Sequence, residues 1–220
     1  MLLVYLRFQI NTITMKSLTT LALSLVIFML STLPLSAQET QFNNRVSAGV
    51  GALTAPDLLE ITSSFVTIVI SGGTVYSGNI SSTGAAFLNY DHQLSSSVSV
   101  GMGLTYSRLT RDLMFRIADE EIKAGTGSSD YYTFMGRFNH TWLKSEWVRL
   151  YYTAAFGFTI IHDKAEIEAK YKPVDNSDNS FHVAFQLTPV GIEIGKTFSV
   201  FAEGGLGYNG LVAAGLSYKF

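Results

Sequence analysis

Hydrophobic and polar residues alternate along most of the chain after residue 44. In residues 97–108, for example, Val98 and Val100 alternate with Ser99 and Gly101. A period of two is that of a β-strand with two different faces. Eight such segments follow one another. We predict strands over residues 45–53, 82–92, 97–108, 131–143, 147–161 and 181–195, and two more within residues 195–220.

The last stretch, residues 195–220, shows the pattern most clearly. It contains two alternating runs joined at Tyr208-Asn209-Gly210, where an Asn-Gly pair suits a tight hairpin turn with positive φ angles. In residues 181–195 the alternation changes phase near Thr188-Pro189. A β-bulge at that point would explain both the change of phase and the presence of a proline.

Long and short links alternate between these predicted strands. A bacterial outer-membrane barrel has an even number of antiparallel strands, with long loops outside the cell and tight turns in the periplasm. We therefore predict an all-β fold, an eight-stranded antiparallel transmembrane β-barrel over residues 45–220. The long links are residues 54–81, 109–130 and 162–180, and the short ones are residues 93–96, 144–146 and 196.

The first long link is less ordinary than the others. It begins with Thr54, Pro56 and Asp57, which is typical of the start of a helix. The apolar, β-branched residues 65–70 follow. Three structures are possible for this link: a short interfacial helix, an extension of the first strand, or a loop folded over the barrel mouth.

Composition agrees with a barrel and indicates a compartment. Of the 220 residues, 15% are charged and 47% are hydrophobic, and a barrel reaches such values by placing apolar residues at alternate positions. Residues 1–37 contain Lys16, a short apolar core and Ala37 before Gln38, which is how a secretory signal peptide is built. We expect cleavage there, with residues 38–44 as a short N-terminal segment and Met15 as an alternative start.

The chain ends on Tyr218-Lys219-Phe220, with no polar tail. This ending resembles the terminal signal of bacterial outer-membrane β-barrels, and residues 45–220 are similar to the small, porin-like outer membrane β-barrel proteins of Bacteroidetes. The resemblance implies a monomer in the outer membrane of a Gram-negative cell envelope, in contact with lipid and lipopolysaccharide. It also implies that the barrel assembly machinery reads Tyr218 and Phe220. It carries over no catalytic residue and no ligand for the outer loops.

Aromatic residues fall at both ends of the predicted strands. Two such belts are expected where aromatic rings lie at the lipid headgroups. The predicted periplasmic belt contains Tyr90, Trp142, Phe198, Tyr218 and Phe220. The predicted outer belt contains Tyr106, Tyr132, Phe158, Phe181 and Tyr208.

The same strand phases direct six charged side chains into the lumen. Eight strands leave an interior about wide enough for side chains to fill, and buried charges are costly unless they are paired. We therefore expect a paired network that also recruits Asp91, Tyr151 or water, and we expect Glu203 to neutralise a cation. The six residues are Arg45, Arg137, Arg149, Glu193, Glu203 and Lys219.

Candidates for chemistry are few. His162-Asp163 and His182 lie near the predicted outer rim, where a surface hydrolase could use such a pair as base and orienter, but no serine motif accompanies them. The acidic stretch 175–180 lacks the glycine and the terminal glutamate of a calcium loop. No basic patch indicates nucleic acid. We predict no catalytic, cofactor-binding or metal site, and no enzyme activity.

Three functions therefore compete. The favoured one is a structural or surface-interaction barrel with a filled, non-conducting lumen. The alternative is a small porin or channel for passive diffusion of small solutes, and the third is a lipid-modifying outer-membrane enzyme. The first two differ in whether a continuous water path crosses the lumen.

Overall fold

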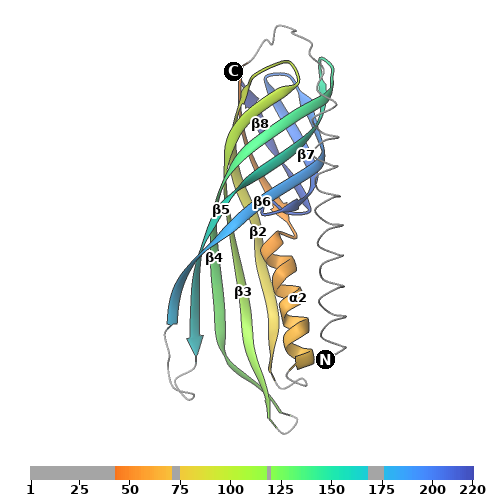
Figure 1. The fold of residues 1–220 in the computed structure, drawn as a ribbon. Helices are drawn as coiled ribbons and strands as arrows, with labels where there is room; N and C mark the ends of the chain where they lie inside the picture. The colour runs from red at the N-terminus through yellow and green to blue at the C-terminus, as the bar shows by residue number, and fades with distance from the viewer. Residues whose placement is uncertain (1–42, 71–74, 118–119, 168–175) are drawn as a thin grey trace, which may run out of the picture. The chain divides into compact units, whose positions relative to one another are not determined.

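The computed structural model describes residues 43–70, 75–117, 120–167 and 176–220. Eight antiparallel strands close into a barrel in which neighbours in sequence are neighbours in the sheet (Figure 1). The predicted all-β fold and the predicted closed barrel of eight antiparallel strands are therefore confirmed. One helix, α2 (Ala55–Ile70), occurs in these residues. The strands are β1 (Asn44–Ala52), β2 (Val75–Gln93), β3 (Val98–Ile117), β4 (Glu120–Lys144), β5 (Val148–Ile167), β6 (Asn176–Gly195), β7 (Phe198–Gly207) and β8 (Val212–Lys219).

The pairing of β1 with β8 closes the barrel. Its register runs from Arg45 opposite Lys219 to Ala52 opposite Val212. Two backbone hydrogen bonds of 2.8 and 2.9 Å between Asn44 and Phe220 continue this pairing. The backbone of Phe220 therefore takes part in the closure, and its role is not confined to its ring.

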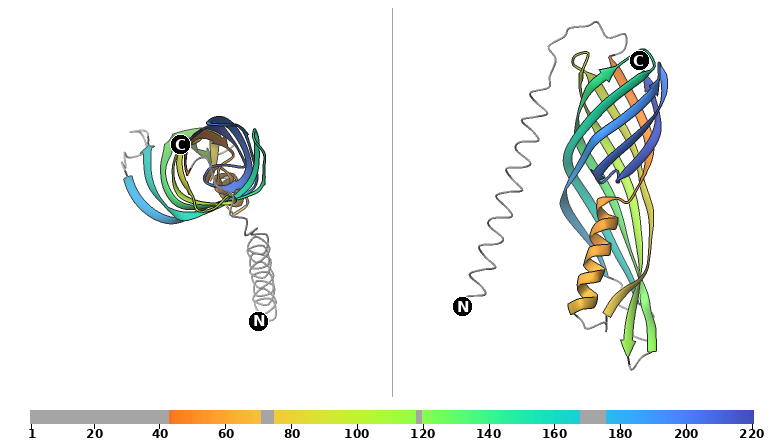
Figure 2. Two further views of the ribbon diagram at one scale, coloured as in Figure 1. Left: turned by 90° about the horizontal axis from the view of Figure 1, so that it is seen from above. Right: turned by 90° about the vertical axis from the view of Figure 1, so that its right-hand side faces the viewer.

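The barrel is closed over only part of its height. Pairing of β1 with β2 ends at Gly51 opposite Ala85, and pairing of β7 with β6 ends at Gly207 opposite Gln186. Beyond these positions β2 to β6 continue as a curved sheet past the ends of the shorter strands (Figures 1 and 2). We call this sheet the five-stranded extension, and the part with all eight strands the closed barrel.

The five-stranded extension corrects all three predicted long links, because residues 75–81 of the first one belong to β2. Most of residues 109–130 belongs to β3 and β4, and much of residues 162–180 belongs to β5 and β6. The hydrophobic alternation that predicts a strand weakens in these segments, but the backbone ladder does not depend on it. Arg111, for example, still pairs with Gly127 in an antiparallel register. Residues 118–119 and 168–175 lie outside the described residues.

Helix α2 begins where the sequence predicts a helix start. The N–H of Asp57 donates to Thr54 Oγ1 at 3.4 Å, and the N–H of Thr54 donates to the Asp57 carboxylate at 2.7 Å. This reciprocal arrangement is a capping box. The helix then runs beside β2 (Figure 2), and Glu60 forms an ion pair of 3.1 Å with Arg111. Of the three structures considered for this link, the helix is confirmed.

No helix in the described part of the chain is long and apolar enough to cross a membrane.

The predicted bulge in β6 is confirmed. The register of β6 with β7 shifts between Leu187 and Val190, and that with β5 shifts between Thr188 and Gly191. Pro189 lies between these positions and is paired on neither side. Its missing N–H therefore removes no hydrogen bond from the ladder.

The connection between β7 and β8 differs from the predicted tight turn. Strand β7 ends at Gly207 and β8 begins at Val212, so residues 208–211 form a loop of four residues. The positive φ angles belong to Gly207 (144°) and Gly210 (102°) rather than to Asn209. Because the loop is wider than a two-residue turn, it can fold back into the barrel, and Tyr208 is buried there.

Candidate functional site

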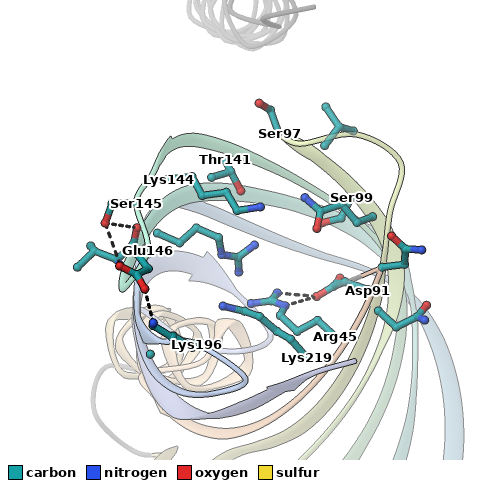
Figure 3. Close-up of a pocket in the computed structure, with 17 residues that line it drawn as sticks. Arg45, Asp91, Ser97, Ser99, Thr141, Lys144, Ser145, Glu146, Lys196 and Lys219 are labelled. Carbon is teal, nitrogen blue, oxygen red and sulfur yellow. Dashed lines mark hydrogen bonds and ion pairs between the residues drawn. The ribbon is translucent and has the colours of Figure 1, made fainter. Parts of the chain in front are cut away.

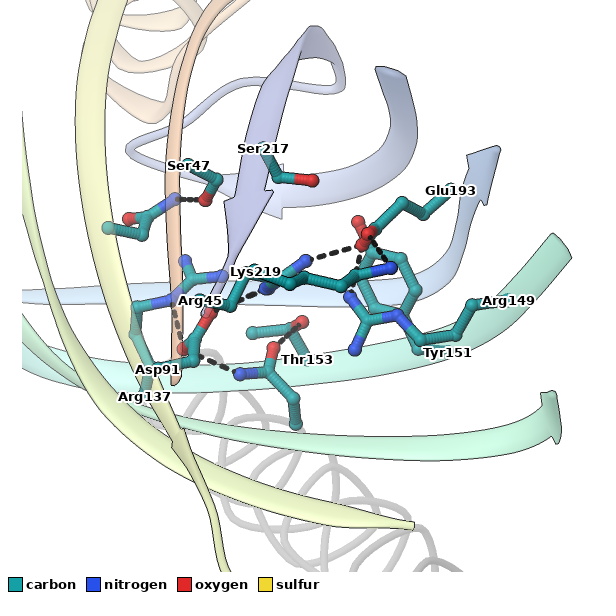
Figure 4. Close-up of polar contacts among 12 residues, drawn as sticks. Arg45, Ser47, Asp91, Arg137, Arg149, Tyr151, Thr153, Glu193, Ser217 and Lys219 are labelled. Atoms are coloured by element: carbon teal, nitrogen blue, oxygen red, sulfur yellow. Dashed lines mark hydrogen bonds and ion pairs between the residues drawn. The ribbon is translucent and has the colours of Figure 1, made fainter. Parts of the chain in front are cut away.

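Charged side chains fill the lumen of the closed barrel near its short turns (Figure 4). Asp91 of β2 is one centre of this network. Its carboxylate accepts hydrogen bonds from Arg45 Nη2 at 2.5 Å and Nε at 3.2 Å, from Arg137 Nε at 3.3 Å and from Asn139 Nδ2 at 2.7 Å. All four side chains are buried. Asp91 therefore faces the lumen, as its predicted role requires.

Glu193 of β6 is the second centre and contacts three cations. Its carboxylate oxygens lie 2.8 Å from Arg45 Nη1, 2.6 Å from Arg149 Nη2 and 2.6 Å from Lys219 Nζ. The hydroxyl of Ser199 also donates to it at 2.7 Å. The Glu193 side chain has no exposed surface, whereas those of Arg149 and Lys219 keep 13% and 20%. Because Arg45 contacts both carboxylates, it joins the two centres.

Tyr151 lies between the arginines and Glu203. Its hydroxyl donates to Glu203 Oε1 at 2.7 Å, and the Arg149 guanidinium lies 4.3 Å from the centre of its ring. A Cβ at Gly191 would approach this ring to 2.5 Å, so the glycine makes room for it. The expectation that Glu203 neutralises a cation is wrong. The register places Glu203 opposite Gly191, where the phenol takes the place expected for the cation.

Positive charge exceeds negative charge in this network. Arg137 is poorly compensated, because its side chain is 1% exposed and both Nη atoms lack a partner among the described residues. Buried polar groups normally have hydrogen-bond partners, so the excess favours negative charge at this end of the lumen. The cations are Arg45, Arg137, Arg149 and Lys219, and the carboxylates are Asp91, Glu193 and Glu203.

Farther from the short turns the lumen is filled by uncharged side chains. Phe87 and Phe201 pack with ring centres 6.2 Å apart. The loop between β7 and β8 inserts Tyr208 and Asn209, and the N–H of Asn209 donates to Gln186 Oε1 at 2.9 Å. We call Tyr208 and Asn209 the loop plug. The charged network, the phenylalanine pair and the loop plug together occupy the interior of the closed barrel.

The prediction is therefore wrong for one residue of the outer aromatic belt. Tyr208 was expected in the outer aromatic belt but is 7% exposed and packs with Met135 and Ala184. The physical reason is the wider loop, which turns the side chain inward. The sequence could not show this, because Tyr208 is the first residue of an apparent turn and has no strand phase.

The other predicted belt residues lie on the outer face. Phe198 contacts Tyr218 at 4.7 Å between ring centres, and Tyr218 stacks on Phe220 at 5.7 Å. A second group contains Tyr106 against Tyr132 at 5.2 Å and Phe158 against Phe181 at 5.1 Å. All are exposed except the half-buried Tyr106. Tyr90 and Trp142 are also exposed, at 38% and 55% of their surfaces.

A cavity of about 230 Å³ lies where the short turns meet the lumen (Figure 3). Arg45, Asp91, Arg149 and Lys219 of the network line it. We call this space the mouth cavity. The end of β4 adds Lys144, and the turns add the ion pair of Lys196 with Glu146. Charged side chains from separate strands and turns thus converge on one space.

The residues weighed for chemistry have other partners. His162 Nδ1 lies 2.5 Å from Asn179 Oδ1, Asp163 accepts a hydrogen bond from Ser129, and His182 lies opposite Thr159 in the register. Asp163 is therefore not positioned as the orienter of His162. Within the described ranges, no group of His, Cys, Asp and Glu could hold a metal ion.

Sequence reasoning missed the neutral members of the lumen. Asn139 shares the inward phase of Arg137, two residues away, and Ser199 shares that of Glu203, four residues away, so this phase could have identified them. Gln186 alternates with the outward Phe185 and Leu187 on β6 and so also has an inward phase. Asn209 has none, because it lies in the turn.

Fold and lumen together define a class: a closed eight-stranded antiparallel barrel with an apolar outer face and a charged interior. No family model matches this chain, and no curated protein matches it.

Proposed function

We propose that the protein is an exported outer-membrane β-barrel with a filled, non-conducting lumen and a structural or surface-interaction role. One observation carries the proposal. The closed barrel exposes large apolar side chains at alternate positions, such as Leu88, Leu104 and Leu216, and buries polar ones at the positions between them. In a water-soluble barrel this arrangement would be reversed, whereas a lipid environment favours it.

The spacing of the aromatic groups supports a membrane. Tyr132 and Trp142 are both exposed on β4 and are ten residues apart. At about 3.3 Å per residue and a tilt of about 40°, this separation corresponds to about 25 Å along the barrel axis. That is the height of the apolar band of outer-membrane barrels. The five-stranded extension would then project beyond the band.

The unequal connections support an orientation. In barrels of this type the short turns face the periplasm and the long connections face outward. The mouth cavity would accordingly face the periplasm, and the five-stranded extension would face the medium. A surface-interaction role is proposed because β4 alone continues for about 40 Å beyond Tyr132, which a membrane span does not require.

The filled lumen supports a non-conducting barrel. The charged network, the phenylalanine pair and the loop plug each occupy part of the interior. A continuous water path through the lumen would require all three groups of side chains to move out of the way. The interior of an eight-stranded barrel is about wide enough for its side chains alone. We therefore favour the filled barrel over the porin alternative.

The signal peptide and the family belong to the same proposal. The predicted signal, residues 1–37, lies outside the described residues, and its support is the sequence pattern. The similarity to small Bacteroidetes barrels likewise rests on the strand pattern and on Tyr218-Lys219-Phe220. Both lead to the same expectation, a mature chain that begins near Gln38 in the outer membrane.

Two measurements test the proposal. N-terminal sequencing of the protein extracted from outer-membrane fractions should begin near Gln38, and a product that retains residues 21–30 in the inner membrane would contradict export. Purified wild-type protein in planar bilayers should give negligible steady conductance. Large, stable single-channel steps would instead establish the porin alternative.

A further inference from the structure

The mouth cavity combines a defined volume with a charge imbalance in its wall. Its volume of about 230 Å³ is below the roughly 300–1,000 Å³ of pockets for drug-sized ligands. It would therefore admit a small molecule or ion. Five cations and two carboxylates line it: Arg45, Lys144, Arg149, Lys196 and Lys219, with Asp91 and Glu146.

Known ion pairs account for part of this charge. Lys196 is paired with Glu146 at the rim, and Glu193 behind the wall contacts Arg45, Arg149 and Lys219. A single carboxylate cannot neutralise three cations. The remaining wall carboxylate, Asp91, is shared between Arg45 and Arg137. The wall and the side chains directly behind it thus retain a net positive charge.

Lys144 is the clearest uncompensated group. Its ammonium makes no hydrogen bond or ion pair among the described residues, and Lys219 and Arg149 repel it. In Figure 3 its side chain extends into the space that Arg45 and Lys219 also line. Lys144 and its cationic neighbours Arg149 and Lys219 thus share one cavity.

Two arginine side chains in and behind the wall of the mouth cavity have hydrogen-bond donors that lack acceptors. Both Nη atoms of Arg137 and the Nε of Arg149 are buried and have no partner in the part of the chain that the structure describes. The Arg137 side chain is 1% exposed. Buried guanidinium donors favour a nearby anion, because charge-assisted hydrogen bonds to oxyanions are stronger than neutral ones.

We propose that the mouth cavity is a binding site for a small dianion, specifically a phosphate monoester. Lysine and arginine supply ammonium and guanidinium donors, which suit the oxygens of a phosphate. A dianion would compensate two of the excess charges, whereas a monoanion such as acetate would compensate one. The site needs no membrane orientation, so this inference stands apart from the proposed function.

The phosphate group could belong to a soluble ester or to a lipid headgroup. The wall residues come from the inward faces and the turns of the barrel, and Lys144 and Lys219 extend toward the lumen and not toward the apolar outer face (Figure 3). A lipid would have to bring its acyl chains into this charged space. We therefore commit to a soluble phosphate monoester.

The test is titration calorimetry of the purified full-length protein in detergent, with glycerol 3-phosphate as probe. Saturable binding at one site is expected, at least about tenfold tighter than that of acetate. Lys144→Gln should weaken it by about tenfold, the value of one charge-assisted contact. Lys164→Gln is the matched control, because Lys164 is an exposed lysine of β5 in the five-stranded extension. It should leave the affinity unchanged.

Several results would overturn the inference. They are absent saturation, equal affinities for acetate and glycerol 3-phosphate, and equal losses in the two lysine variants. Phosphatidic acid in mixed micelles should not compete; if it competes as well as the soluble ester, the assignment to a soluble ligand is wrong. The comparison of probes on the wild-type protein needs no variant, so it stands even if Lys144→Gln does not fold.

Discussion

Glu193 provides the sharpest test of the lumen network, because one carboxylate holds three cations. Its contacts with Arg45, Arg149 and Lys219 are 2.6–2.8 Å long, and its side chain is fully buried. Glu193→Gln keeps the shape of the side chain and removes the charge. The three cations would then lose their shared counter-ion within the barrel.

The burial of Glu193 sets the size of the expected loss in the free energy of unfolding. Removing one partner of a buried ion pair costs about 3–5 kcal/mol. Arg149 and Lys219 keep some solvent contact, and the amide oxygen of glutamine can still accept one hydrogen bond. We therefore expect Glu193→Gln to lower the free energy of unfolding by about 2–4 kcal/mol.

The assay is urea unfolding in detergent micelles, followed by the fluorescence of Trp142 and Trp147. Glu146→Gln is the control, because Glu146 pairs with Lys196 at the rim and keeps 71% of its side chain exposed. It should cost at most about 0.5 kcal/mol. If Glu193→Gln costs no more than Glu146→Gln, the network does not stabilise the barrel and the reasoning fails.

A double-mutant cycle separates charge from packing. When Lys219→Gln is added to Glu193→Gln, one uncompensated cation is removed. The second change should therefore cost less than it does in the wild-type protein, with a coupling energy of about 1 kcal/mol or more. Strict additivity would indicate that Glu193 acts through packing alone.

Three further predictions concern the loop plug, the contact of Gly191 with Tyr151 and the last residue. Tyr208→Ala should lower the free energy of unfolding by about 2–4 kcal/mol, against a smaller loss for the exposed Tyr132→Ala; equal losses would argue against the plug. Gly191→Val should cost about 1–3 kcal/mol in the same assay, because it meets the Tyr151 ring, and Tyr151→Leu should recover part of the loss. Phe220→Ala keeps the backbone bonds to Asn44 and should reduce the heat-modifiable folded form in cells more than after refolding in detergent; normal cellular assembly would count against the predicted signal.

The closed barrel was the predictable part of the fold. Alternation of apolar and polar residues fixes which face of each strand points outward, and the short turns fix antiparallel neighbours. Strand number, the bulge at Thr188-Pro189 and the helix start at Thr54 all follow from such local rules. They are predictable because each depends on residues close together in the sequence.

The unpredicted parts depend on pairings between distant residues. The five-stranded extension is held by its backbone ladder, which leaves little trace in the order of side chains. Which carboxylate meets which cation depends on register as well as phase. Strand phase alone placed Glu203 in the lumen, but it could not show that Tyr151 would take the hydrogen bond expected for a cation.

The two parts of the barrel also differ in what a substitution can reveal. In the closed barrel the inward side chains of the charged network contact one another, so a change such as Glu193→Gln alters stability first. In the five-stranded extension, β2 and β6 each lack a strand partner on one side beyond Ala85 and Gln186 among the described strands. Exposed side chains there contribute little to the free energy of unfolding. The proposed surface role should therefore be lost through changes in the extension that leave the free energy of unfolding unaltered, whereas changes in the lumen should affect both together.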